Sequence, residues 1–168
     1  MEATPSEIVP SPSARREALL FELVEQRFAL ALSDVSELTR ACAVQGLPKA
    51  PEVVIGVVNL RGQVVPVLDL RRRLGLPEKA LDPSDCFVFA RVAERRVALR
   101  VDRLLGIEEL TITALGEAPN LPEGLAYVSG VAAVADGVVF IYDLELFLSG
   151  AEVAVLDRAL SLAKQGGP

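Results

Sequence analysis

The side chains best able to do chemistry are four aspartates, Asp34, Asp69, Asp102 and Asp143, and the thiol of Cys42. A carboxylate or thiol usually needs a neighbouring base to become a catalyst, and histidine, the commonest such partner, does not occur in the sequence. Each aspartate stands where a turn or helix is expected to begin, which gives it an ordinary structural role. The pattern therefore predicts a protein that is not an enzyme.

The sequence also lacks the patterns that hold cofactors and metals. Gly56, Gly62 and Gly75 do not have the spacing of a phosphate-binding loop or a dinucleotide fingerprint. Cys42 and Cys86 are far apart and belong to no CxxC motif, and no cluster of soft or imidazole ligands occurs. We expect no cofactor, no metal, and two reduced cysteines packed as small apolar residues.

Arg61 is the polar residue whose position most suggests a binding role. It follows an apolar run and precedes Gly62, so it lies at a strand end or in a tight turn. It is either a solvated loop arginine or, as we favour, a partly buried arginine bound to a carboxylate, with Glu37 as a plausible partner. We interpret the later run 71–73, three consecutive arginines, as a solvated helical face, with partner contact as the alternative.

Composition narrows the class of protein further. The chain has 168 residues, is 51% apolar and carries a net charge of −6, which argues against nucleic-acid binding. Residues 56–75, however, contain four arginines and only one aspartate, so a basic segment is embedded in an acidic chain. No apolar run reaches the length of a membrane span and no secretion signal is evident, so we expect cytoplasmic residence without membrane insertion.

The elements that carry these residues occur twice. Residues 56–74 align without a gap with residues 130–148, so that Gly56 corresponds to Gly130 and Asp69 to Asp143. The apolar positions are shared while the arginines of the first copy are not. A shared apolar skeleton indicates a shared fold, and the unshared polar residues are where function is expected.

A hairpin precedes each copy. Residues 19–32 and 86–101 each read as two strands around a polar tip, so every half comprises a hairpin, a connector, a strand pair and an aspartate-capped turn. This predicts a mainly β fold of two small, closed or nearly closed barrels, with the second copy at roughly 84–148. Pro66 lacks an amide hydrogen, which predicts that its strand is an edge or begins near this residue.

The ends of the chain differ from the repeats. Residues 1–17 are rich in Pro, Ser and Glu and are expected to form a disordered leader before a domain at 18–165. Gly75 and Gly150 are expected to stop the turns that precede them. Ser149 and Glu152 have the spacing of a capping box, which predicts a helix over 149–165, placed by conjecture on the first half.

Four apolar residues follow the two hairpins at matching places: Val35, Leu38, Leu104 and Ile107. Their ordinary role is in the core. Two barrels packed side by side also leave an apolar groove between them, and such grooves accept helices of partner proteins. Binding in a groove needs no catalytic group.

Residues Gly56–Leu76, GVVNLRGQVVPVLDLRRRLGL, closely resemble the signature of the CheW family of bacterial chemotaxis coupling proteins. The resemblance extends from about Leu19 to Leu162. It implies two SH3-like five-stranded β-barrel subdomains related by internal duplication, with a C-terminal helix. It also implies a non-catalytic adaptor that couples the cytoplasmic tips of chemoreceptors to the regulatory domain of the histidine kinase CheA, at membrane-associated arrays.

The resemblance assigns roles to particular residues. The family's receptor groove lies between the barrels, where Val35, Leu38, Leu104 and Ile107 match, and an Arg–Glu pair of the family matches Arg61, beside Gly62, and Glu37. Kinase contact uses barrel ends and is placed around Gly130 and Val131.

Three alternatives stay open. They are a paralogue that binds receptors but uncouples the kinase, one that serves pilus or gliding motility, and a small ligand-binding or enzymatic double barrel.

Overall fold

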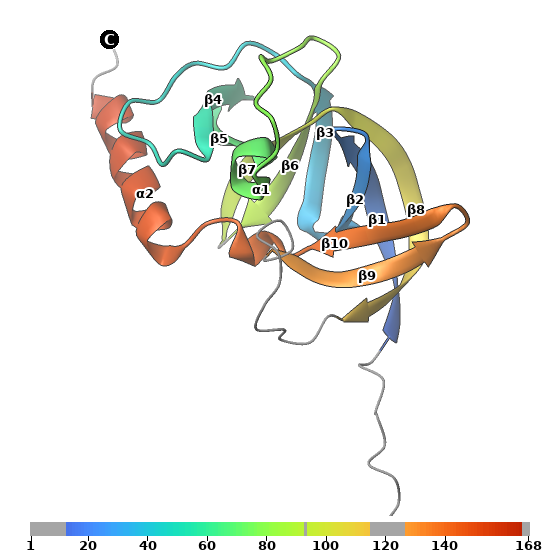
Figure 1. The fold of residues 1–168 in the computed structure, drawn as a ribbon. Coiled ribbons are helices and arrows are strands. Elements are labelled where there is room, and N and C mark those ends of the chain that lie inside the picture. The colour runs from blue at the N-terminus through green and yellow to red at the C-terminus, as the bar shows by residue number, and fades with distance from the viewer. Residues whose placement is uncertain (1–12, 93, 115–126, 166–168) are drawn as a thin grey trace, which may run out of the picture.

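The computed structural model describes residues 13–92, 94–114 and 127–165. One of its two sheets is a closed barrel with the strand order β1-β2-β10-β9-β8. It lies on the right in Figure 1. Its strands are β1 (Ser13–Leu23), β2 (Gln26–Ala31), β8 (Arg103–Ala114), β9 (Val128–Val134) and β10 (Gly137–Tyr142).

The second sheet also has five strands, in the order β3-β6-β7-β5-β4. These strands are β3 (Val35–Arg40), β4 (Val54–Leu60), β5 (Gln63–Asp69), β6 (Cys86–Val92) and β7 (Arg95–Val101). Three short helical elements and one long one complete the described fold: η1 (Leu32–Asp34), α1 (Leu70–Leu74), η3 (Leu144–Leu146) and α2 (Gly150–Gln165). The prediction of a mainly β fold of two five-stranded units with a C-terminal helix is confirmed.

The two sequence copies exchange their hairpins. The first hairpin, β1–β2, joins the barrel of β8–β10, and the second, β6–β7, joins the sheet of β3–β5. Two parallel strand pairs make the exchange, with Ile141 opposite Ala29 and Val67 opposite Ala98. These pairs occupy equivalent places in the repeat, so the structure supports the duplication. A spatial unit is nevertheless not one sequence copy, and residues 84–148 do not form a separate subdomain.

Apolar side chains of both sheets form one shared core. Leu19 and Phe21 of the barrel pack in the same buried cluster as Leu68 and Leu99 of the second sheet. Smaller buried clusters lie within each sheet. Because the strands interlock around this core, burial of apolar surface holds the two units together as well as each unit by itself.

The repeated aspartates cap helical turns as the sequence predicts. Asp69 accepts a hydrogen bond from the Arg71 amide at 3.0 Å at the start of α1, and Asp143 does the same for the Glu145 amide at the start of η3. Gly75 ends α1 in the left-handed conformation, with φ 68°. The corresponding prediction for Gly150 is wrong, because this glycine is the first residue of α2.

Helix α2 begins with the predicted capping box. The Glu152 amide donates to Ser149 Oγ at 3.1 Å, and the Ser149 amide donates to Glu152 Oε1 at 2.9 Å. Leu156 and Ala159 are buried, and ion pairs join Arg73 of α1 to Glu152 and Arg95 of β7 to Asp157. The helix therefore packs on elements of both halves, α1 and β7 among them, and Figure 1 shows it beside the β4–β5 pair.

Three further expectations differ from the structure. Strand β1 begins at Ser13, so the last five residues of the expected leader belong to the barrel, and residues 1–12 lie outside the described part. Strand β5 is an interior strand, although its pairing with β7 starts at Val67, immediately after Pro66. Both cysteines are free, as expected, but Cys42 is exposed rather than packed.

No helix in the described ranges is long and apolar enough to cross a membrane.

Candidate partner-binding surfaces

The turn between β4 and β5 holds Arg61 against β3. Arg61 and Gly62 both have positive φ, 52° and 86°, as a two-residue hairpin turn of this kind requires. The Asn59 side chain accepts a hydrogen bond from the Gly62 amide at 2.8 Å and fixes the turn. Arg61 Nη2 donates to Glu37 Oε1 at 2.7 Å, which is the pair the sequence suggests. The expected partial burial is wrong, because the Arg61 side chain is 76% exposed.

A second arginine, Arg96 at the start of β7, lies on the other side of Glu37. Its Nη2 is 3.9 Å from Glu37 Oε2, and its Nη1 donates weakly to Gln63 Oε1 at 3.4 Å. The guanidinium also lies over the Phe89 ring, 6.0 Å from the centroid. Sequence reasoning missed Arg96, because only the order of strands in the folded sheet brings the β6–β7 tip close to β3.

The four predicted groove residues divide into two kinds. Val35 and Leu104 are half-buried and pack against the shared core. Leu38 and Ile107 remain exposed, by 39% and 55%, and are large enough to contact a partner. An ion pair brings Glu37 and Arg61 together, and Val35 and Leu104 both pack against the same buried cluster. It places Leu38 on β3 of one sheet and Ile107 on β8 of the other.

Gly130 and Val131 lie on β9 in the barrel wall. Gly130 is buried, and a Cβ atom there would meet Ile112 Cγ2 at 2.6 Å and the Thr113 carbonyl oxygen at 3.0 Å. Glycine at this position therefore lets β8 and β9 approach closely. The equivalent Gly56 lets the backbone of Gln45 approach in the same way. The repeated glycine thus has a packing role in both copies.

The three arginines of α1 are anchored by partners instead of forming a solvated face. Arg71 is 3% exposed and donates to both carboxylate oxygens of Asp102, at 2.6 and 2.7 Å. Arg72 Nη1 donates to the Glu52 carbonyl oxygen at 2.7 Å. Arg73 Nη2 donates to Glu152 Oε2 at 2.5 Å. The interpretation of residues 71–73 as a solvated face is wrong for Arg71, which is buried, and for Arg73, which is half-buried, whereas Arg72 is exposed.

Asp102 connects this helix to the barrel. It follows β7 and precedes β8, and its Oδ2 also accepts the Val24 amide at 2.9 Å. Burial alone would raise the pKa of Asp102, but the hydrogen bonds from Arg71 and Val24 outweigh burial and lower it. The same hydrogen bond raises the pKa of Arg71. The pair is therefore charged at neutral pH, and it ties both sheets to α1.

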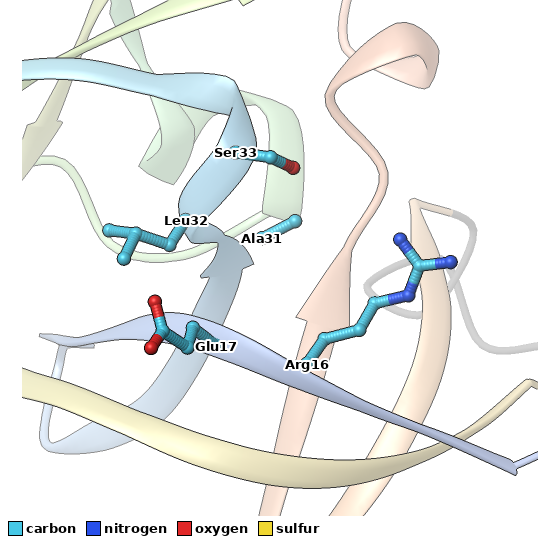
Figure 2. A pocket seen from close by; sticks show the side chains of 5 residues that line it. All are labelled: Arg16, Glu17, Ala31, Leu32 and Ser33. Carbon is cyan, nitrogen blue, oxygen red and sulfur yellow. The ribbon is translucent and has the colours of Figure 1, made fainter.

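The described surface also has shallow cavities of mixed polarity. One of about 410 Å³ is lined by Arg16, Glu17, Ala31, Leu32 and Ser33. Figure 2 shows that the charged ends of Arg16 and Glu17, neighbours on β1, point apart. Among the described residues, no group of three or more acidic or cysteine side chains is placed to hold a metal ion.

The described fold thus combines two interlocked β units, an ion-paired turn and exposed apolar side chains on separate strands. The CheW-like domain model matches residues 17–152, and the chain belongs to this family of non-catalytic scaffold proteins of chemotaxis.

Individual relatives agree with this assignment. A chemotaxis protein CheW of Klebsiella aerogenes is 28% identical over 145 residues, which are 85% of this chain and 87% of the relative. The chemotaxis protein CheW of Thermotoga maritima is 30% identical over 75% of this chain and 82% of its own length. A crystal structure of the scaffolding protein TtCheW from Thermoanaerobacter tengcongensis matches the fold with a TM-score of 0.74. This match covers 83% of this chain and 96% of the other at 23% identity.

Proposed function

We propose that this chain is an adaptor that couples the cytoplasmic tips of chemoreceptors to the histidine kinase CheA. The proposal rests on Glu37 of β3. Its carboxylate is held between Arg61 and Arg96, and the next residue along the strand, Leu38, is exposed. These ion pairs fix the position of Glu37 at the edge of an exposed surface. Partner binding at such a surface needs no catalytic group. An amphipathic receptor hairpin binds by its apolar side chains, and the charged rim fixes its register.

The two partners use different parts of the molecule. The receptor surface comprises Val35, Glu37, Leu38, Arg61, Gly62, Leu104 and Ile107. Kinase contact is proposed on the barrel around Gly130 and Val131 of β9 and is extended to Val138, which is exposed near the tip of the same hairpin. Each contact is expected to be of micromolar strength, about −8 kcal/mol, and to be strengthened by many copies in a cytoplasmic array at the membrane.

The test is co-sedimentation of the purified chain with receptor-containing membranes and CheA, with kinase activity read in the same tubes. The matched variants are Arg61→Ala and Arg15→Ala, because Arg15 also forms an exposed ion pair, with Glu109. Exposed pairs contribute at most about 1 kcal/mol, so both variants should keep their melting temperature within a few degrees. Arg61→Ala should lose kinase activation, whereas Arg15→Ala should retain it.

Three results bear on the proposal. Activation that follows co-sedimentation supports coupling. Receptor binding that leaves the kinase soluble indicates an uncoupling relative instead. If Arg61→Ala lowers stability as much as it lowers activation, Arg61 has only a structural role.

A further inference from the structure

Helix α2 and strand β5 enclose a groove that borders the proposed receptor surface at Gly62 and Arg96 and extends away from it along α2. The cavity has a volume of about 380 Å³ and lies between the β4–β5 hairpin, the β6–β7 tip and α2. We call it the α2 groove; its lining residues are Gly62, Gln63, Val64, Val65, Pro66, Arg95, Arg96, Leu160 and Lys164.

The α2 groove combines an apolar surface with positive charge. Val64 is 47% exposed, and Leu160 is half-buried on the facing helix. Arg95, Arg96 and Lys164 line the groove and no acidic residue of the described part does, although the whole chain carries a net charge of −6. Lysine and arginine side chains also cover apolar surface with their stems, so the rim extends the apolar contact area.

Ion pairs neutralise only part of this charge. Arg95 pairs with Asp157 of α2, and Glu37 lies between Arg61 and Arg96. Among the described residues, the three cations that line the groove, Arg95, Arg96 and Lys164, are thus set against two acids that pair with them, which leaves a net charge of +1. An acidic partner is attracted to such a site, and a basic partner is repelled.

We infer that the α2 groove binds an acidic amphipathic helix of a protein partner. Apolar side chains spaced by three and four residues would contact Val64 and Leu160, while flanking carboxylates would reach Arg96 and Lys164. The groove shares Gly62 and Arg96 with the proposed receptor surface, but Val64, Leu160 and Lys164 belong to the groove alone, and they carry the inference.

The probes for the test are two synthetic helical peptides with the same leucine pattern, one flanked by glutamates and the other by lysines. Each carries a fluorophore, and its anisotropy is measured with the full chain at low and at physiological salt. The glutamate peptide should bind at least about tenfold more tightly than the lysine peptide, and added salt should narrow this difference.

The chain supplies matched controls for the variants. Val64→Asp is compared with Val138→Asp, because Val138 is the equivalent residue of the second copy and is 52% exposed. Lys164→Glu is compared with Lys79→Glu, an exposed lysine outside the groove. Val64→Asp and Lys164→Glu should each weaken the binding of the glutamate peptide about tenfold. The two control variants should change the affinity for this peptide less than about twofold.

Three results overturn the inference. They are equal binding of both peptides, equal effects of groove and control variants, and self-association of the chain that Val64→Asp abolishes without any peptide. The last result would assign the groove to a second copy of this chain. None of these measurements uses a receptor or a kinase, so this inference and the coupling proposal can fail separately.

Discussion

Replacing Asp102 with asparagine should destabilise the whole fold, because it leaves the buried Arg71 guanidinium without its counter-charge. The substitution keeps the size of the side chain and an oxygen that can accept the Val24 amide, so it removes mainly the charge. Breaking a buried ion pair by removing one partner costs about 3–5 kcal/mol. The lower end, about 3 kcal/mol, applies here because the Asp102 side chain keeps 16% of its exposure.

The loss can be measured by urea unfolding followed by circular dichroism, since the chain has no tryptophan. For a domain of this size, 3 kcal/mol corresponds to a fall in melting temperature of roughly 6–12 °C. The double variant Arg71→Met/Asp102→Asn should recover part of the loss, because no unpaired buried charge remains. Glu109→Gln, which breaks the exposed pair with Arg15, is the control and should cost less than about 1 kcal/mol.

Acid gives a second, independent check on Asp102. Its folded-state pKa lies below the ordinary 3.8, so its contribution to stability is present above about pH 4. That contribution is lost as the pH falls through the folded-state pKa. The difference in unfolding free energy between the wild type and Asp102→Asn should therefore close there. A loss below about 1 kcal/mol at pH 7, or a gap that acid leaves unchanged, would refute the reasoning.

Two further substitutions test the packing of the repeats and of α2. Gly130→Ala should cost about 1–3 kcal/mol because its Cβ would meet β8 at 2.6 Å, whereas Gly46→Ala, with nothing within 4 Å, should be near neutral in the same thermal melts. Ser149→Ala should remove the cap of α2, cost about 1 kcal/mol and speed amide exchange in the first turn of this helix. Unchanged exchange there would show that burial of Leu156 alone fixes the helix start.

Local patterns predicted the elements of this fold better than their arrangement. The hairpins, the aspartate caps and the start of α2 depend on residues a few positions apart, and the structure contains all of them. The exchange of hairpins depends on the parallel pairs of β10 with β2 and of β5 with β7, which no short pattern encodes. The duplication indicated equivalent strands but not which copy each hairpin would join.

The candidate site shows the same division between local and distant contacts. The pair of Arg61 with Glu37 could be suggested from the sequence, but the exposure of Arg61 depends on where the fold places the β4–β5 turn. The run of arginines at 71–73 looked solvated because three adjacent charges on a short helix usually are. Its carboxylate partners, Asp102 and Glu152, follow 31 and 79 residues later and become visible only in the folded chain.

The duplication also explains how one small chain can present two different ends. Val64 and Val138 are equivalent and both exposed at hairpins, so each end offers a similar apolar contact. The charges beside them differ in sign: Arg61 at the first hairpin pairs with Glu37 of β3, whereas Asp136 at the second pairs with Arg27 of β2, at 2.6 Å. A partner that matches one exposed charge is repelled by the other. Because both hairpins are anchored in one interlocked core, the two ends keep a fixed relation, as the proposed binding of two different partners requires.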